Sequence, residues 1–257
     1  MGAEMNRADS AGVPWEGRSF DPNPAPDDDG SAPEALMAAI SRFHAGDGTE
    51  VDVVDQVRES RLLIPLLANA GETGATAEGL TVDKTQELSI VTVTGPDGRT
   101  VLPVFSSVEA MKTWNPEARP VPAAGTRVAL AAASENTDIV VIDPLSDSEF
   151  VIRRPAVWAI AQSVEWAPSF LRAEVRDEFA ASAADEENVI DVQLLAGDPG
   201  ARLQGPELVV QIAMREGLDR ETLDAIMDRL RTSWSSSELI AQSVDSLAIQ
   251  VVRAPAA

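Results

Sequence analysis

The stretch ELSIVTVTGPDGRTVLPVFS, residues 87–106, decides how this chain folds. It reads as two strands closed by the turn GPDG at 95–98. Pro96 suits the second position of a type I turn because its φ is already set, and Gly98 can adopt the left-handed conformation of a bulged hairpin. Apolar residues stand on both faces of each strand, so we expect cover on both sides. Pro103 has no amide hydrogen, so its nitrogen should face an unpaired edge or a bulge.

Further strands and helices are predicted on either side of this hairpin. Short apolar runs predict strands at 61–68, 139–142, 150–152, 189–195, 207–213 and 247–252. Helical spacing predicts helices at 32–44, 49–59, 106–114, 123–134, from 155 onward, at 169–184 and at 220–232. Capping signals stand at Ser31, Thr49, Ser106, Asp219 and Ser235. A flexible polar loop is expected at 71–79 and a proline-rich connector at 119–122.

The order of these elements predicts an α+β fold with two domains, each a mostly antiparallel sheet packed with helices. A change in composition between 163 and 168 divides a first domain at 31–163 from a second at 164–257. Residues 1–30 are acidic, rich in proline and poor in apolar residues, so they are predicted to be a disordered leader. Trp15 and Phe20 in the leader are either stray aromatics of a solvated tail or a short docking motif.

The charge and cysteine content exclude several classes of function. The chain has 42 acidic and 20 basic residues and a net charge of −22, which disfavours nucleic acid and anionic membranes as partners. Such a surface suits solubility or a basic protein partner. The sequence has no cysteine, so it has no disulfide, thiol nucleophile or cysteine-bound zinc, and this suits a reducing cytoplasm. No signal peptide and no apolar run long enough to span a bilayer are recognised, so we predict a cytoplasmic protein.

Several motifs of the first predicted domain resemble the N-terminal domain of the SseB family, in the two-domain form common in actinobacteria. The motifs are RLLIPL at 61–66, ELSIVTV at 87–93, GRTVLPVFSS at 98–107, MKTW at 111–114 and RRPAVWA at 153–159. The resemblance implies the fold of that domain, but it implies no reaction, catalytic residue or cofactor. An unrelated secretion component carries the same family name, and the membrane-active helices that such a component needs are absent from this sequence.

No group of residues has the spacing of a catalytic or metal site. His44 is the only histidine, so a Ser-His-Asp triad would need it, and its place at a predicted helix end favours capping. Ser106 and Ser107 lie at a strand-to-helix turn, but the G-x-S-x-G motif is absent and capping explains both. A cluster of acids could bind a hard cation, although it lacks EF-hand spacing and is better explained as a solvated hairpin end. The cluster is Asp138, Asp143, Asp147 and Glu149. Trp114 and Trp158 are expected in the core. We predict no catalytic residue, no metal and no cofactor.

The dibasic step Arg153-Arg154 is the candidate binding site. It stands directly before Pro155, which opens a predicted helix, and two guanidinium groups beside a helix N-terminus could hold a small anion. Arg99 and Arg119 could approach the same end of the sheet. The alternative is that the two side chains point to opposite sides of the strand and one pairs with a nearby acid.

These observations predict a non-catalytic protein that acts through contacts with other proteins. The alternative is an enzyme or small-anion binder that uses Arg153 and Arg154. A secretion-associated factor is a weaker alternative, because it rests on the family name alone.

Overall fold

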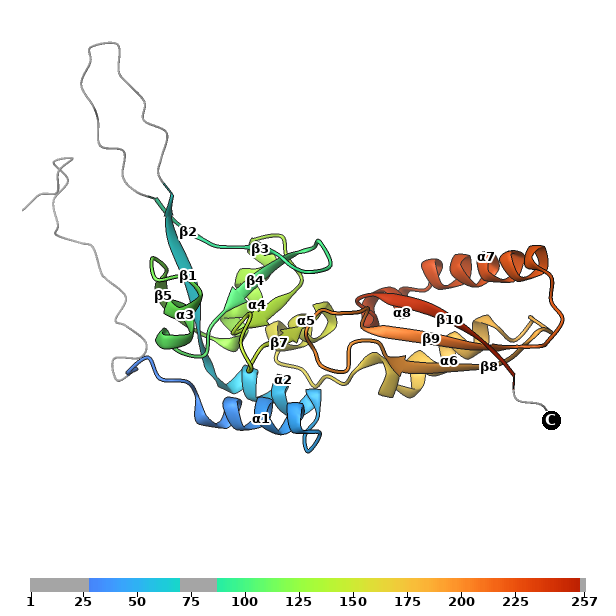
Figure 1. Ribbon diagram of the computed structural model, residues 1–257, viewed down its shortest axis with the longest axis horizontal. Helices are drawn as coiled ribbons and strands as arrows, with labels where there is room; N and C mark the ends of the chain where they lie inside the picture. The colour runs from blue at the N-terminus through green and yellow to red at the C-terminus, as the bar shows by residue number, and fades with distance from the viewer. Residues whose placement is uncertain (1–27, 70–86, 255–257) are drawn as a thin grey trace, which may run out of the picture.

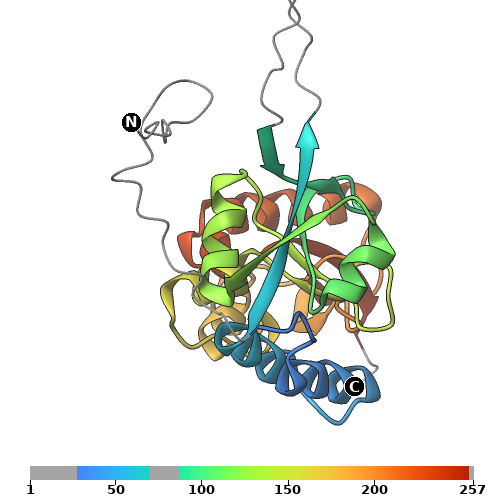
Figure 2. The same cartoon turned by 90° about the vertical axis from the view of Figure 1, so that its left-hand side faces the viewer.

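The computed structural model describes residues 28–69 and 87–254, and within them the chain is an α+β fold with mostly antiparallel sheets, as predicted. Residues 28–69 and 87–163 (the N-terminal half) lie side by side with residues 164–254 (the C-terminal half) along the longest axis (Figure 1). Viewed end-on, the strands of the N-terminal half cross the molecule with helices around them (Figure 2). The predicted leader up to residue 27 and the polar loop at 71–79 lie outside the described residues.

Two small sheets form the centre of the N-terminal half. One has the order β2-β1-β5, with β1 at Arg61–Asn69, β2 at Glu87–Ile90 and β5 at Arg119–Ala124. The other has the order β3-β4-β6-β7, with β3 at Val93–Thr94, β4 at Thr100–Val104, β6 at Val140–Ile142 and β7 at Phe150–Ile152. Leu63 and Phe105 exchange backbone hydrogen bonds of 2.8 and 2.9 Å. This bridge connects the two sheets.

The predicted hairpin forms, but its first strand is shorter than expected. The Gly98 amide donates to the Gly95 carbonyl at 3.0 Å, and Gly98 has a φ of +83°, as the turn requires. Only β3 pairs with β4, whereas β2 pairs with β1, so the strand predicted from residue 87 is divided between two sheets. The division follows from the open edge of β1, which pairs with residues 87–90 and leaves only 93–94 for β4.

The prolines of both sheets lie where no amide donor is needed. On one side β4 pairs with β3 at Thr100 and Val101, and the bridge to β1 forms at Phe105, just after β4, so Pro103 falls in the gap as predicted. The segment 119–122 was expected to be a connector, but it is the start of the edge strand β5. Its proline at 120 faces Pro65 of β1, a pair in which neither nitrogen can donate.

Helices cover one face of the sheets, and other segments cover the second face. The first group is α1 (Glu34–Ala45), α2 (Glu50–Glu59), α4 (Gly125–Ser134) and α5 (Arg154–Gln162). These helices share a core with Leu102 and Ile142 of the sheet. On the opposite side, α3 (Val108–Trp114) packs Met111 against Phe105, and Leu203 from the C-terminal half covers Val101. The predicted cover on both sides is therefore present.

Some helix starts differ from the capping signals in the sequence. Thr49 and Asp219 cap α2 and α7 (Arg220–Ser236) as predicted, and their side chains accept hydrogen bonds from the Asp52 and Thr222 amides. The other three predictions are wrong: Ser107 replaces Ser106, Ser237 replaces Ser235, and Pro33, without a side-chain bond, takes the place expected for Ser31. In the first case the reason is local, because the hydroxyl of Ser106 binds a buried carboxylate instead.

One three-stranded sheet with a layer of helices forms the C-terminal half. The sheet has the order β10-β9-β8, with β8 at Val189–Ala196, β9 at Leu208–Met214 and β10 at Leu247–Arg253. The helices are α6 (Ala173–Ser182), α7 (Arg220–Ser236) and α8 (Glu238–Ser243). The helix predicted at 169–184 is interrupted, because the backbone of Arg172 is extended between the 3₁₀ turn Ser169–Leu171 and α6. Phe179 and Trp234 stack edge to face in the core, with ring centroids 5.1 Å apart.

None of the helices in the two described ranges combines the length and the apolar character needed to cross a bilayer.

Candidate functional site

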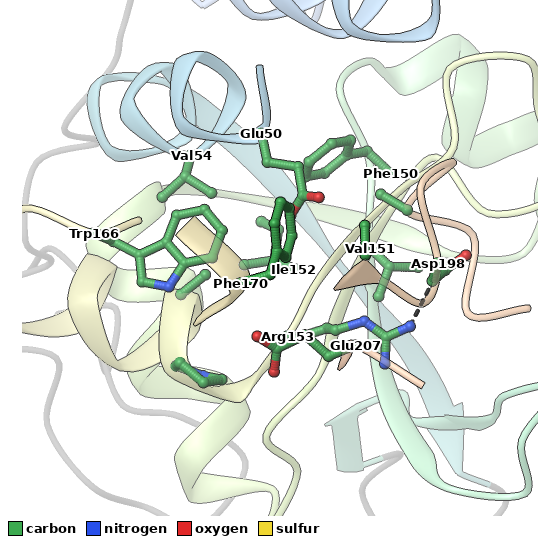
Figure 3. Close-up of a pocket in the computed structure, with 14 residues that line it drawn as sticks. Glu50, Val54, Phe150, Val151, Ile152, Arg153, Trp166, Phe170, Asp198 and Glu207 are labelled. Carbon is green, nitrogen blue, oxygen red and sulfur yellow. Dashed lines mark hydrogen bonds and ion pairs between the residues drawn. The ribbon is translucent and has the colours of Figure 1, made fainter. Parts of the chain in front are cut away.

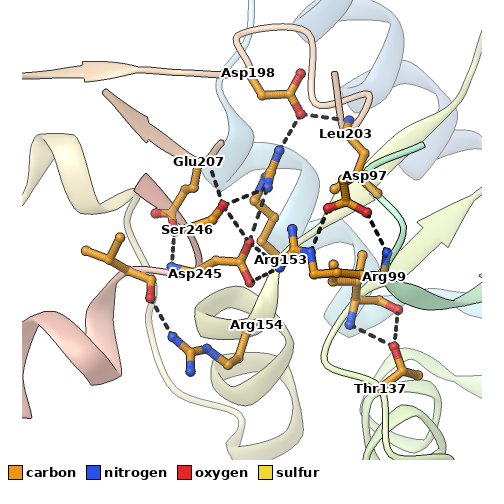
Figure 4. Close-up of polar contacts among 12 residues, drawn as sticks. Asp97, Arg99, Thr137, Arg153, Arg154, Asp198, Leu203, Glu207, Asp245 and Ser246 are labelled. Atoms are coloured by element: carbon orange, nitrogen blue, oxygen red, sulfur yellow. Dashed lines mark hydrogen bonds and ion pairs between the residues drawn. The ribbon is translucent and has the colours of Figure 1, made fainter. Parts of the chain in front are cut away.

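Arg153 lies at the junction of the two halves, where its guanidinium group forms ion pairs. The residue links β7 to α5, and only 9% of its side chain is exposed. Its Nη2 donates to Asp198 Oδ2 at 2.6 Å and to the Gly205 carbonyl at 2.8 Å, and its Nη1 lies 3.2 Å from Asp245 Oδ2 (Figure 4). Both carboxylates belong to the C-terminal half. The buried ion pairs of Arg153 therefore connect the two halves.

Arg99 joins the same cluster from the hairpin, as the sequence suggested it could. Its Nη1 donates to both oxygens of Asp245 at 3.0 Å, and its Nε donates to Asp97 at 2.6 Å. Only 2% of the Asp245 side chain is exposed, so two guanidinium groups share one buried carboxylate. A buried charge needs such partners, because desolvation would otherwise make ionisation costly.

The loop at 197–206 carries Asp198 to the junction. Asp198 Oδ2 also accepts a hydrogen bond of 2.7 Å from the Leu203 amide, which folds the loop around the carboxylate. The Ala201 carbonyl accepts a hydrogen bond of 2.8 Å from the Val151 amide of β7. Ala201 and Leu203 both have a positive φ, of 48° and 57°, so the loop holds a costly backbone conformation to make these contacts.

Arg154 is held by backbone carbonyls and not by an acid. Its Nη2 donates to the carbonyls of Ala241 and Val244, at the end of α8. Cationic groups stabilise the C-terminal end of a helix because they donate hydrogen bonds to its last carbonyls and interact favourably with the helix dipole. The guanidinium also lies over the ring of Trp158, 5.2 Å from its centroid. Trp158 was expected in the core, but it is 38% exposed on the surface of α5.

The third predicted anion-binding residue lies elsewhere. Arg119 is exposed at the start of β5, in the other sheet, and within the described ranges it makes no contact with the Arg153 cluster. The structure thus brings together Arg153, Arg154 and Arg99 at the junction and leaves Arg119 apart.

A small cavity beside Arg153 is lined by three carboxyl groups, those of Glu50, Asp198 and Glu207 (Figure 3). Its volume is about 20 Å³, which is room for about one water molecule. Glu207 accepts hydrogen bonds from the Ser169 hydroxyl, at 2.6 Å, and from the Asp245 amide. Burial nevertheless raises the pKa of Glu207. The cavity is too small for a substrate or a cofactor.

Glu50 also lines the cavity, and its environment favours the protonated form. It is the first residue of α2, and within the described part of the chain its carboxylate has no hydrogen bond or ion pair. The pKa of Glu50 is raised to about 7, mainly by burial and also by the Glu207 and Asp198 carboxylates, while Arg153 opposes the shift. Glu50 therefore ionises near neutral pH in the folded protein.

Replacing Glu50 with glutamine should stabilise the protein at pH 8 and not at pH 4. The folded protein keeps the proton over the window from about 4.5 to about 7, in which the unfolded chain releases it. Stability is therefore lost as the pH rises through this window, and the penalty is complete above it. Glu50→Gln should raise the free energy of unfolding by about 1–3 kcal/mol at pH 8, measured by urea unfolding.

Glu34→Gln provides the matched control, because Glu34 is also the first residue of a helix but is exposed. It should lower stability slightly at pH 8, by about 0.3–1 kcal/mol, through the loss of a charge at the helix N-terminus. If the free energy of unfolding of both variants has the same pH dependence as that of the parent protein, the Glu50 carboxyl group does not cause the loss of stability at high pH.

The other candidates from the sequence make contacts within the fold. Ser106 donates its hydroxyl to Asp143 Oδ2 at 2.6 Å, and Asp143 also accepts the Ser106 amide at 2.8 Å and the Ser148 hydroxyl at 3.1 Å. His44 instead places Nε2 3.1 Å from the Glu149 carbonyl and is exposed. Among the residues that the structure describes, no three His, Cys, Asp or Glu side chains are grouped closely enough to hold a metal ion.

The acids of the junction were not singled out by the sequence. The chain has 42 acidic residues, and nothing in the spacing of Asp198, Asp245, Glu50 or Glu207 distinguishes them from exposed ones. The glycines around the loop are the one available signal. A Cβ on Gly197 would lie 2.3 Å from the Pro206 carbonyl, and one on Gly205 would lie 2.5 Å from the Gly197 carbonyl. Such close approach marks a tightly folded loop.

Comparison with known proteins identifies the N-terminal half. The family model described as SseB protein N-terminal domain matches residues 34–159, which span α1 to α5 and end within the helix that follows Arg153. A search of curated proteins and a search of solved structures each found no match. The matched region includes the motifs at 61–66, 87–93 and 98–107 that suggested the resemblance. The chain therefore belongs to the SseB family, through an SseB protein N-terminal domain at residues 34–159.

Proposed function

We propose that this SseB-family protein is non-catalytic and acts in the cytoplasm through contacts with other proteins. The observation that carries the proposal is that the candidate anion-binding residues Arg153 and Arg154 bind groups of the same chain. Arg153 is paired with Asp198 and Asp245, and Arg154 is bound to carbonyls at the end of α8. The cavity beside Arg153, of about 20 Å³, leaves no room for a metabolite there.

The surface supports a protein partner. Large apolar side chains remain exposed around the junction, among them Trp158 at 38%, Val164 at 48% and Leu171 at 64%. Exposed apolar groups that lie near one another are typical of interaction surfaces. The net charge of −22 favours a basic partner, and the absence of cysteine supports a reducing compartment.

Affinity capture of the tagged full chain from cells that naturally express it tests this proposal. The eluate is analysed for proteins by mass spectrometry and for small ligands by native mass measurement of the intact complex. We expect a protein partner in near-stoichiometric amount and no bound small anion. Arg154→Ala leaves the buried ion pairs of Arg153 intact. Its complex should show the same intact mass as the parent complex, apart from the substitution, because no small anion is lost.

The alternative, a small-anion binder or enzyme, predicts the opposite result. A ligand that is bound by the parent protein, is lost in Arg154→Ala, and is accompanied by no protein partner would refute the proposed function.

A further inference from the structure

An open groove lies on the surface between the two halves and is lined by residues of α5, the segment 164–167 and α8. Its volume is about 870 Å³, far larger than the cavity beside Glu50. Apolar side chains from three segments line it: Trp158 from α5, Val164 and Trp166 from the connecting segment at 163–168, and Leu239 from α8. The size and the apolar lining are typical of a surface that binds a ligand or a peptide.

The tryptophan in this groove is held in place by its surroundings. Arg154 lies over the Trp158 ring at 5.2 Å from the centroid, and Arg154 is itself fixed by two carbonyls at the end of α8. The exposed ring therefore needs little ordering when a partner binds, which favours affinity. Tryptophan is also the residue type most enriched among residues that dominate binding energy at interfaces.

The connecting segment that forms one wall is also fixed. The Val164 amide donates to the Ala159 carbonyl at 3.0 Å, and the Val164 carbonyl accepts a hydrogen bond of 2.7 Å from Arg58 Nη2. These two bonds present the Val164 side chain, which is 48% exposed, beside Trp158. The groove is therefore preformed and does not need a partner to shape it.

The charges in the groove favour a basic partner. Among its described lining residues the single cation is Arg172, which already pairs with Glu174 at 2.8 Å and donates to the Ser243 hydroxyl at 3.1 Å. Glu165 is exposed and has no ion pair or hydrogen bond within the described ranges. Its charge remains free, and the net charge of −22 would attract a cationic segment from a distance.

We propose that this groove binds a short segment of a partner protein that places an apolar side chain on Trp158 and Val164 and a lysine or arginine beside Glu165. The inference rests on the proposed function and names the surface and the chemistry of the partner. Glu165 and the net charge of −22 would disfavour an acidic segment of the same apolar content, because like charges oppose each other across an interface.

Peptide binding to the full chain tests the groove. The probe is a fluorescein-labelled peptide of about twelve leucine, phenylalanine and lysine residues, with apolar residues on one face of a helix. A counterpart carries glutamate at every lysine position. Fluorescence anisotropy is measured for the parent protein and for Trp158→Ala, Val164→Asp, Glu165→Lys and Ile190→Ala. Ile190 is 51% exposed on β8, beside the strand end that pairs with Met214 and remote from the groove, so it is the matched control.

We expect saturable binding of the lysine peptide and much weaker binding of the glutamate peptide. Trp158→Ala and Val164→Asp should each weaken the lysine peptide about tenfold or more, Glu165→Lys a few fold, and Ile190→Ala less than about twofold. Circular dichroism confirms that each variant is folded.

Three results would overturn the groove proposal: equal binding of both peptides, equal effects of Trp158→Ala and Ile190→Ala, or no saturable binding of the lysine peptide. A native partner whose capture is unchanged by Trp158→Ala would also overturn it, but would leave the proposed function intact. The failure of the two proposals is therefore distinguishable.

Discussion

Arg153→Ala should lower the free energy of unfolding by about 3–5 kcal/mol, because the change leaves buried acid without its partner. Asp198 has no other cation within hydrogen-bonding distance in the described chain, and Asp245 would keep only Arg99. The missing guanidinium would also leave the Gly205 carbonyl without its donor. Urea unfolding of the full chain at pH 7, followed by circular dichroism and tryptophan fluorescence, measures the loss. Coincidence of the two signals allows the loss to be expressed as a free energy of unfolding.

A surface arginine and a neutralised pair provide the controls. Arg220 is 93% exposed and lies 3.6 Å from Asp224, so Arg220→Ala should change stability by less than about 0.5 kcal/mol. The double variant Arg153→Met with Asp198→Asn should recover much of the loss, because it removes both charges together. Equal effects of Arg153→Ala and Arg220→Ala would show that the buried contacts do not hold the halves together.

Asp143→Ala should cost about 2–4 kcal/mol, the second largest effect. The carboxylate is 2% exposed and accepts three hydrogen bonds, from the amide and hydroxyl of Ser106 and from the Ser148 hydroxyl. Removing it leaves the buried amide and hydroxyl of Ser106 without an acceptor. Asp143 also has a φ of +44°, a conformation that aspartate and asparagine tolerate better than alanine. Thermal unfolding and urea unfolding at pH 7 both report the change.

Two substitutions in the same turn separate these causes. Asp147 is exposed, and its side chain makes no hydrogen bond within the described residues, so Asp147→Ala should be nearly neutral. Asp143→Asn keeps the favoured backbone conformation and one acceptor oxygen, so it should cost less than Asp143→Ala. A neutral Asp143→Ala would refute the structural role that we assign to this carboxylate.

Local signals in the sequence predicted most elements of the fold. The turn at 95–98, the caps at Thr49 and Asp219 and the apolar runs all depend on neighbours in the chain, and the structure confirms them. The pairing of β2 with β1 depends instead on which distant strand edge is open. No local pattern at 87–94 indicates that the strand divides between two sheets.

The arginines of the site could be predicted from the sequence, but their acidic partners could not. Arg153 and Arg154 stand out because they form a dibasic step before a helix, and both lie at the junction. Their partners could not be predicted, since the pairing with Asp198 spans 45 residues and the pairing with Asp245 spans 92. Contacts at such distances are set by how the two halves meet, and the spacing of charges along the chain does not record them.

Thermal unfolding in increasing phosphate at constant ionic strength tests the central claim, which is that the junction arginines serve the fold and not a ligand. A ligand that binds only the folded state raises the unfolding midpoint progressively with its concentration. We predict that the midpoint stays within about 1 °C for the parent protein and for Arg154→Ala alike. A midpoint that rises steadily with phosphate in the parent protein and stays constant in Arg154→Ala would contradict the account.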